Sequence, residues 1–491
     1  MNSVRRIVKN SASSLVSQIA NPMCSFLLAL FIARNLGVNE FGKFSAVLSL
    51  LYVFEAFSSM GFNYLVTREV SQDASQANKY LVNASLIGVI AASIMMCIMW
   101  LVANLISDSH DVIQASYILS IALIPYSLTA VSQSICRAFE RIEYITISEV
   151  VANVFKVILG LFLLYQGYGI VTLMVVLVAS HFIMFGVSLY FASKCIPVRC
   201  FEFDLQLCRW IIKATPVFAI IFILNTVRWN IDILILTRLM GEREVGFYSA
   251  ANKLLTIGKM GISCYIVAIQ PIIFRLYKTS LEKYKIACED SVRYLLIMAI
   301  PIVLGTILLS DRFIVTVYKN AFLPSGRALS IMVWILILSG SNLIFANALV
   351  ASNKQRINLQ GNLISMVLNI FLNLLLIPKF SYIGAAIASL SSSAMLIAYQ
   401  YWFVSKKLFK INYIRIIMKP SISACAMGVF ILMYREMNLY ALIPISALVY
   451  VVANLVLKTF IPRDIGYLRE LFHDRRGVDV LEVKGKGATT L

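Results

Sequence analysis

Charged residues are scarce in this chain. Only 14% of its 491 residues are Asp, Glu, Lys or Arg, whereas a soluble domain averages roughly 25%. Hydrophobic residues make up 60% of the chain. This composition excludes an ordinary soluble domain and predicts a polytopic membrane protein. Acidic residues are scarcer than basic ones: the chain has 24 Asp and Glu against 43 Lys and Arg, so its formal net charge is +19.

Enzyme signatures are also missing. The sequence contains no GxxxxGK[ST] loop, no HExxH and no GxSxG, and its polar stretches reach only 20 to 30 residues. Such stretches are too short for a nucleotide-binding or catalytic domain. We therefore expect no enzyme, no catalytic residues, no ATP-driven export by this chain alone, and no cofactor other than a coupled H⁺ or Na⁺.

Metal and nucleic-acid partners are equally unexpected. The nine cysteines show no CxxC or Cys/His ligand spacing and mostly lie within apolar runs, as small core residues do. The basic residues lie in short loops between apolar runs, so membrane topology explains the positive charge better than a nucleic acid does.

Apolar runs of about 20 residues, the length that a bilayer core requires, recur along the chain. They predict fourteen spans near 13–33, 44–66, 81–105, 112–135, 145–165, 169–192, 211–237, 247–273, 293–310, 328–351, 358–378, 384–404, 417–434 and 440–460. If the N-terminus is cytoplasmic, 30 Lys and Arg flank the spans on that side and 9 on the other. This bias predicts that both termini are cytoplasmic.

One segment occurs twice. Residues 32–46 return as residues 236–250 at an offset of 204, without a gap. The identical pairs are Arg34/Arg238, Gly37/Gly241, Glu40/Glu244, Gly42/Gly246, Ser45/Ser249 and Ala46/Ala250. A second register, at an offset of 215, relates spans 5–6 to spans 11–12. Duplicated blocks of spans are typical of secondary transporters, whose substrate path runs between the two halves.

These patterns predict an all-α integral membrane fold of about fourteen transmembrane helices. Two pseudo-symmetric six-helix lobes surround a central cavity, and two extra helices follow at the C-terminus. The expected divisions are an N-lobe at 1–195, a C-lobe at 210–405, the extra spans at 415–461 and a basic cytoplasmic tail at 462–491.

Polar side chains inside a membrane are costly and usually face a cavity or another helix. Four spans carry them on one helical face: Ser14, Gln18, Asn21 and Ser25; Tyr52, Glu55, Ser59 and Asn63; Asn225, Arg228 and Asp232; Asn252, Thr256, Lys259 and Ser263. The offset of 204 pairs Glu55 with Lys259 and Asn21 with Asn225, as expected if each copy lines one wall of a shared cavity.

We select as substrate-binding candidates Lys156, Arg228, Lys259, Asn21, Asn225, Gln18 and Tyr52, and as ion-coupling candidates Glu55 and Asp232. Arg228 and Asp232 are spaced i, i+4, so they either neutralise each other or face the cavity. His181, alone in its span, is interpreted as an interhelical hydrogen-bonding residue rather than a proton relay. Four membrane cations against three acids favour an anionic substrate such as a phosphate.

The duplicated segment also resembles a known family. Residues 33–42 are similar to the "AR-x-LG-x-x-x-FG" signature of bacterial polysaccharide-export flippases. The run 231–236, leading into Gly246-Phe247-Tyr248-Ser249-Ala250-Ala251-Asn252-Lys253, and the run 382–388 resemble their later motifs. The resemblance covers nearly the whole chain and places it with O-antigen-type flippases of the multidrug/oligosaccharidyl-lipid/polysaccharide exporter superfamily.

This resemblance implies that the protein moves undecaprenyl-pyrophosphate-linked oligosaccharide from the inner to the outer leaflet of the bacterial inner membrane. It implies membrane lipids, and other polysaccharide-assembly proteins, as partners. Lipid II flippases carry arginines in their first helix, and this chain has none between Arg6 and Arg34, which disfavours lipid II as substrate. The alternatives are a cation-driven multidrug or metabolite exporter of the same fold and a non-transporting scaffold for glycan assembly.

Overall fold

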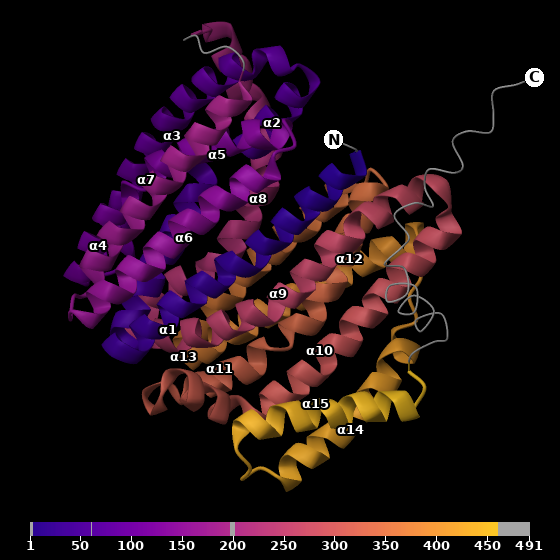
Figure 1. The fold of residues 1–491 in the computed structure, drawn as a ribbon. Helices are drawn as coiled ribbons and strands as arrows, with labels where there is room; N and C mark the ends of the chain where they lie inside the picture. Colours follow the sequence, from indigo (N-terminus) through magenta and orange to yellow (C-terminus); the bar gives the residue numbers. More distant parts are fainter. Residues whose placement is uncertain (1–2, 60, 197–201, 460–491) are drawn as a thin grey trace, which may run out of the picture. The chain divides into compact units, whose positions relative to one another are not determined.

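The computed structural model describes residues 3–59, 61–196 and 202–459, and all regular structure within them is helical (Figure 1). The helices are α1 Ser3–Ser58, α2 Phe62–Gln72, α3 Ala77–Ile106, α4 His110–Ser120, α5 Leu123–Ala138, α6 Ile142–Tyr165, α7 Ile170–Cys195, α8 Leu205–Met240, α9 Glu242–Thr279, α10 Leu281–Tyr318, α11 Ser325–Met332, α12 Ile335–Ala351, α13 Gln355–Lys407, α14 Tyr413–Met433 and α15 Leu439–Val456. Two short 3₁₀ turns, η1 Ala74–Gln76 and η2 Asn320–Phe322, complete them.

The predicted all-α membrane class is confirmed. Eleven helical stretches of the described chain are long and apolar enough to cross a membrane. Each predicted span falls on one helix or on two consecutive ones, although the number of crossings stays a prediction. The predicted tail at 462–491 lies outside the described residues.

Two helices contain a break that separates predicted spans. The break in α1 is at Gly37, with φ 83° and ψ −173°, between the first and second spans. The break in α13 is at Ser381, with φ 51°, between the eleventh and twelfth. Positive φ is open to glycine at little cost, which explains why a glycine ends the first span.

The sequence repeat is also a repeat of backbone geometry. Gly241, the partner of Gly37 at the offset of 204, separates α8 from α9 with φ 82° and ψ −179°. The second register is shifted by two residues in the structure. The left-handed residues before α6 and α13 are Glu140 and Asn353, both at φ 56° and 213 positions apart.

The chain divides into two compact units. One comprises Met1–Leu295 and Leu309–Ile411, and therefore holds most of both repeats; the other comprises Leu296–Leu308 and Asn412–Leu491. In the second unit α14 packs on α15 (Figure 1), and the Tyr450 hydroxyl donates to the Ile297 carbonyl at 2.7 Å. The division into two six-helix lobes within the first unit stays a prediction.

Helix connections in the first unit alternate between two ends. The contact of Lys9 with Glu143 at 3.0 Å brings the start of the chain to the α5–α6 connection, and we call this the N-terminal end. The α2–α3 and α7–α8 connections share it. The breaks at Gly37 and Gly241 lie at the opposite end, with the α3–α4 connection.

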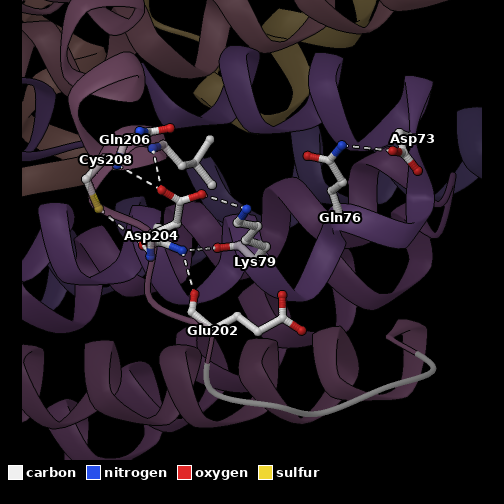
Figure 2. Close-up of polar contacts among 9 residues, drawn as sticks. Asp73, Gln76, Lys79, Glu202, Asp204, Gln206 and Cys208 are labelled. Carbon is white, nitrogen blue, oxygen red and sulfur yellow. Dashed lines mark hydrogen bonds and ion pairs between the residues drawn. The ribbon is translucent and has the colours of Figure 1, made fainter.

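The segment that joins the two repeats is tied to α3 by Asn83, and Figure 2 shows the neighbouring contacts of Lys79, Glu202 and Asp204. The fully buried Asn83 amide donates to the Glu202 carbonyl at 2.8 Å and accepts from the Asp204 backbone N–H at 2.9 Å. Asp204 caps α8 through the N–H groups of Gln206 and Leu207 and pairs with Lys79 at 2.6 Å. We call Lys79, Asn83, Glu202 and Asp204 the linker clasp. It fixes the start of the second repeat on the first.

Candidate functional site

The polar face of α1 is used for contacts with α6. The Ser17 hydroxyl donates to Thr146 Oγ1 at 3.1 Å. One turn further, the Asn21 amide donates to Glu149 Oε2 at 2.8 Å and accepts from Asn153 Nδ2 at 2.7 Å. Asn21 of the predicted stripe, together with Ser17, therefore forms a hydrogen-bonded ladder within the N-terminal repeat.

Two lysines, one from each repeat, donate hydrogen bonds at or beside this ladder. The Lys156 ammonium donates to Asn153 Oδ1 at 2.6 Å, and the Lys253 ammonium donates to Ser25 Oγ at 3.2 Å. Their like charges repel each other. The α1 face thus brings a cation of α6 and a cation of α9 into one region, and Lys253 was not among the predicted binding residues.

Glu55 contacts His181 of α7. His181 Nδ1 lies 2.7 Å from the Leu177 carbonyl oxygen, which can only accept, so Nδ1 carries a proton. Nε2 lies 3.2 Å from Glu55 Oε1. A neutral ring with its lone pair on Nε2 cannot bond to a carboxylate. The pair therefore holds one further proton, either on the carboxyl or as an imidazolium.

Asp232 lies at the centre of a buried network in the second repeat. It is 2% exposed. The Tyr248 hydroxyl donates to it at 2.7 Å, the Asn373 amide at 2.5 Å, and the Ser389 hydroxyl donates as well. The Oδ1 atoms of Asn369 and Asn373 are buried without a hydrogen-bond partner. Orphaned oxygens of this kind are rare and need an explanation.

Arg228 and Lys259 gather around Trp229. The Lys259 ammonium lies 3.5 Å from the centre of a Trp229 ring, and the Arg228 guanidinium carbon lies 4.7 Å from it. Cation–π contacts of this kind contribute about 0.5–2 kcal/mol. Among the described residues no ion pair joins Arg228 to Asp232. The Arg228 and Asp232 side chains therefore contact different partners rather than each other.

The charges of the membrane region follow a pattern. Within the described part of the chain, none of the four cations Lys156, Arg228, Lys253 and Lys259 pairs with a carboxylate. The acids Glu55, Glu149 and Asp232 instead contact a histidine, an asparagine and a set of neutral donors. The site is consequently a set of cations without a direct ion pair, beside acids that are hydrogen-bonded to other groups.

The other predicted candidates lie outside these clusters. Gln18 of α1 is exposed, Tyr52 is 37% exposed, and Asn225 of α8 is half-buried. Sequence reasoning missed Trp229, Tyr248 and Ser389, which contact Lys259 and Asp232. Tyr248 lies within the duplicated segment and offered a signal. Ser389 is brought to Asp232 only by folding across 157 residues, and no spacing rule predicts that.

The two copies of the duplicated segment pack against each other at the end opposite the N-terminus. A Cβ atom at Gly42 would lie 1.7 Å from the Glu242 carbonyl oxygen, and one at Gly246 would lie 2.3 Å from the Val38 carbonyl oxygen. Only hydrogen side chains permit this approach. The two glycines are equivalent positions of the repeat, so the contact is pseudo-symmetric.

The duplicated arginines reinforce that contact reciprocally. Arg34 of the first copy donates to the Thr316 and Val317 carbonyls of the second repeat at 2.7 and 2.6 Å. Arg238 of the second copy pairs with Asp108 of the first repeat at 3.1 Å. Each copy therefore reaches across to the other half, which holds this end of the bundle closed.

Comparison with known proteins agrees with this architecture. The family described as polysaccharide biosynthesis protein matches residues 7–277, and the chain belongs to that family. The capsular polysaccharide biosynthesis protein CapF of Staphylococcus aureus is 22% identical over 82% of this chain and 100% of its own length. The probable low-salt glycan biosynthesis flippase Agl15 of Haloferax volcanii is 21% identical over 79% of this chain and 81% of its own.

Solved structures share the fold. The lipid II flippase MurJ in an inward closed conformation superposes with a TM-score of 0.77 at 17% identity, over 93% of this chain and 99% of that one. An inward-facing multidrug transporter of the MATE family reaches 0.63 at 13% identity, over 80% and 98%. The resemblance to polysaccharide flippases is confirmed, and the fold is the one that MurJ and this MATE transporter share.

Proposed function

We propose that this protein is a flippase that moves an undecaprenyl-pyrophosphate-linked oligosaccharide from the inner to the outer leaflet of the bacterial inner membrane. The proposal includes the predicted topology, with both termini cytoplasmic, and alternating access between the two repeats. The observation that carries it is the set of membrane cations without counter-ions.

Magnitudes favour an anionic substrate. A charge taken out of water without a partner costs several kcal/mol, whereas the cation–π contacts of Lys259 and Arg228 return about 0.5–2 kcal/mol each. The retention of cations at such a cost is best explained by an anionic substrate that binds to them during transport. A pyrophosphate supplies several acceptor oxygens to Arg and Lys at once.

Asparagine, serine and tyrosine side chains are the natural partners of sugar hydroxyl groups. The exposed Gln18 and Tyr52 retain hydrogen-bonding capacity. Asn21, in contrast, already uses its amide on Glu149 and Asn153. We therefore assign sugar contacts to Gln18 and Tyr52, and a positioning role to Asn21.

Coupling to an ion enters the proposal through two acids. The Glu55–His181 pair suits a proton, because its hydrogen bond exists only in the protonated pair. The Asp232 network suits Na⁺ or a proton, because a carboxylate, a serine hydroxyl and two asparagine oxygens offer hard oxygen ligands. Releasing either ion alters contacts between helices, which is how an ion gradient drives alternating access.

Depletion in a bacterial host tests the function. We expect lipid-linked oligosaccharide to accumulate on the cytoplasmic leaflet and the surface polymer to disappear. Wild-type protein should restore the polymer, and Lys259→Ala should not, although it should insert into the membrane normally. An intact surface polymer after depletion would refute the proposal.

The drug-exporter alternative has less support. Its fold is the same, so the fold does not separate the two functions. A cationic drug would meet four uncompensated cations, and like-charge repulsion makes that binding unfavourable. Changed susceptibility to cationic dyes on deletion, with normal surface glycan, would favour the alternative.

A further inference from the structure

A cavity lies away from the clusters described above. It has a volume of about 460 Å³ and is lined by Asn63, Tyr64, Thr67, Arg68, Arg137 and Phe222, among others. These residues come from α2, the last turn of α5 and the middle of α8. Arg68 and Arg137 lie near the ends of helices that lead into the α2–α3 and α5–α6 connections. The cavity therefore lies toward the N-terminal end of the bundle.

Arg137 is the cation of this cavity that lacks a direct ion pair. Its Nη1 lies 3.4 Å from Asn63 Oδ1, a long hydrogen bond to a neutral group, and among the described residues it makes no ion pair. Arg68, in contrast, pairs with Glu69 at 2.5 Å. The net charge presented to the cavity is therefore positive, and it originates chiefly from Arg137.

A structural role does not account for Arg137. Its place in the last turn of α5 offers a weak stabilising interaction with the helix dipole. Partial burial of an unpaired guanidinium costs more than that. The long hydrogen bond to the Asn63 amide does not offset that cost. The missing partner is an anion that the cavity receives.

Neighbouring groups define the kind of anion. A guanidinium forms bidentate hydrogen bonds with phosphate oxygens. Tyr64 is 59% exposed and offers a ring face and a hydroxyl to a sugar. The Thr67 hydroxyl donates to the Asn63 carbonyl at 2.6 Å, so it helps hold this wall in place rather than competing for the ligand.

We infer that this cavity is a docking site for the diphosphate of the lipid-linked substrate, with Arg137 as its principal ligand and Tyr64 beside the first sugar. The inference rests on the proposed function and adds a site that precedes the Lys156, Arg228 and Lys259 region. The substrate would bind here from the N-terminal end and then pass to the deeper cations.

Binding of inorganic pyrophosphate to the purified full-length protein in lipid nanodiscs tests the site. Arg137→Gln should weaken binding by about 10-fold or more, because a hydrogen bond to a charged group contributes about 1.5–3 kcal/mol. Arg137→Lys should retain part of the affinity, and this result would show that a substitution at position 137 does not unfold the protein. Arg141→Gln, an exposed arginine of the same end, is the matched control and should bind as wild type does.

A double variant separates the effect of Arg137 from that of the deeper cations. In Lys259→Ala protein, Arg137→Gln should still cause its full loss of pyrophosphate affinity. Wild-type affinity in Arg137→Gln would overturn the docking site, even if Lys259→Ala abolishes export and the proposed function stands. Loss of pyrophosphate binding in Arg137→Gln, together with intact surface glycan after depletion of the protein, would keep the anion site and refute the flippase.

Discussion

Gly42 and Gly246 lie against each other across the two repeats. A Cβ atom on Gly42 would be 3.0 Å from the Gly246 backbone nitrogen and still closer to the Glu242 carbonyl. The same two positions are related by the sequence repeat, so one motif, used twice, closes one end of the bundle against itself. The alternating access that we propose would require this contact to break and re-form.

Alanine at Gly42 should therefore hinder closure of this end. Overpacking costs about 1–3 kcal/mol, which shifts an open–closed equilibrium roughly 5- to 150-fold. We expect Gly42→Ala to reduce surface glycan strongly and to raise the labelling of a cysteine placed at position 38. Gly186→Ala is the control, because nothing lies within 4 Å of its Cβ position. Unchanged labelling and export in Gly42→Ala would show that the contact is not a gate.

Removal of a deep cation should impair transport without unfolding the protein. Lys259→Ala takes away an uncompensated charge, so we expect unchanged or higher thermal stability and at least a 10-fold loss of export, as for a hydrogen-bonded charge of about 1.5–3 kcal/mol. Lys278→Ala, exposed on the same helix, should have no effect. Normal export in Lys259→Ala would remove the cation from the substrate path.

The proton of the Glu55–His181 pair gives a separate prediction. In Glu55→Gln the amide donates to His181 Nε2, so the contact and the fold survive while the releasable proton is lost. We expect stable protein whose transport no longer depends on a pH gradient, measured in proteoliposomes. Asp232→Asn should instead abolish any Na⁺ dependence. Wild-type pH dependence in Glu55→Gln would exclude this pair as the coupling site.

The linker clasp predicts how stability depends on pH. The ion pair with Lys79 and the N–H groups at the start of α8 lower the pKa of Asp204. A carboxyl group whose pKa is lower in the folded state stabilises the fold at pH values above its unfolded-state pKa, about 3.9. This contribution is lost as the pH falls through the folded-state pKa. Asp204→Asn should thus lower Tm at pH 7, and its Tm should converge with wild type in acid.

Asp73→Asn is the matched control for that experiment. The pKa of Asp73 is also lowered, but by Ser75 and Gln76 within its own turn, so no contact between the repeats depends on it. We expect a smaller change of Tm at pH 7. An equal effect of both substitutions would show that the clasp contributes nothing beyond a local helix cap.

The parts of the fold that were predictable are those set by local pattern. Apolar runs located the helices, and the duplicated glycines marked equivalent breaks, because positive φ selects glycine. The partners of Asp232 and Glu55 were not predictable, because Ser389 and His181 reach them through tertiary packing rather than spacing. The cation at Arg137 was overlooked because a charge near a helix end is ordinarily a solvated one.

The central claim is tested most directly by reconstitution. Purified protein is placed in liposomes carrying a labelled undecaprenyl-pyrophosphate oligosaccharide, and a membrane-impermeant enzyme that cleaves the sugar reports how much reaches the outer leaflet. We predict that wild-type liposomes expose nearly all of the substrate, whereas Lys259→Ala liposomes expose only the fraction seen without protein. Equal exposure in wild-type and protein-free liposomes would contradict the account.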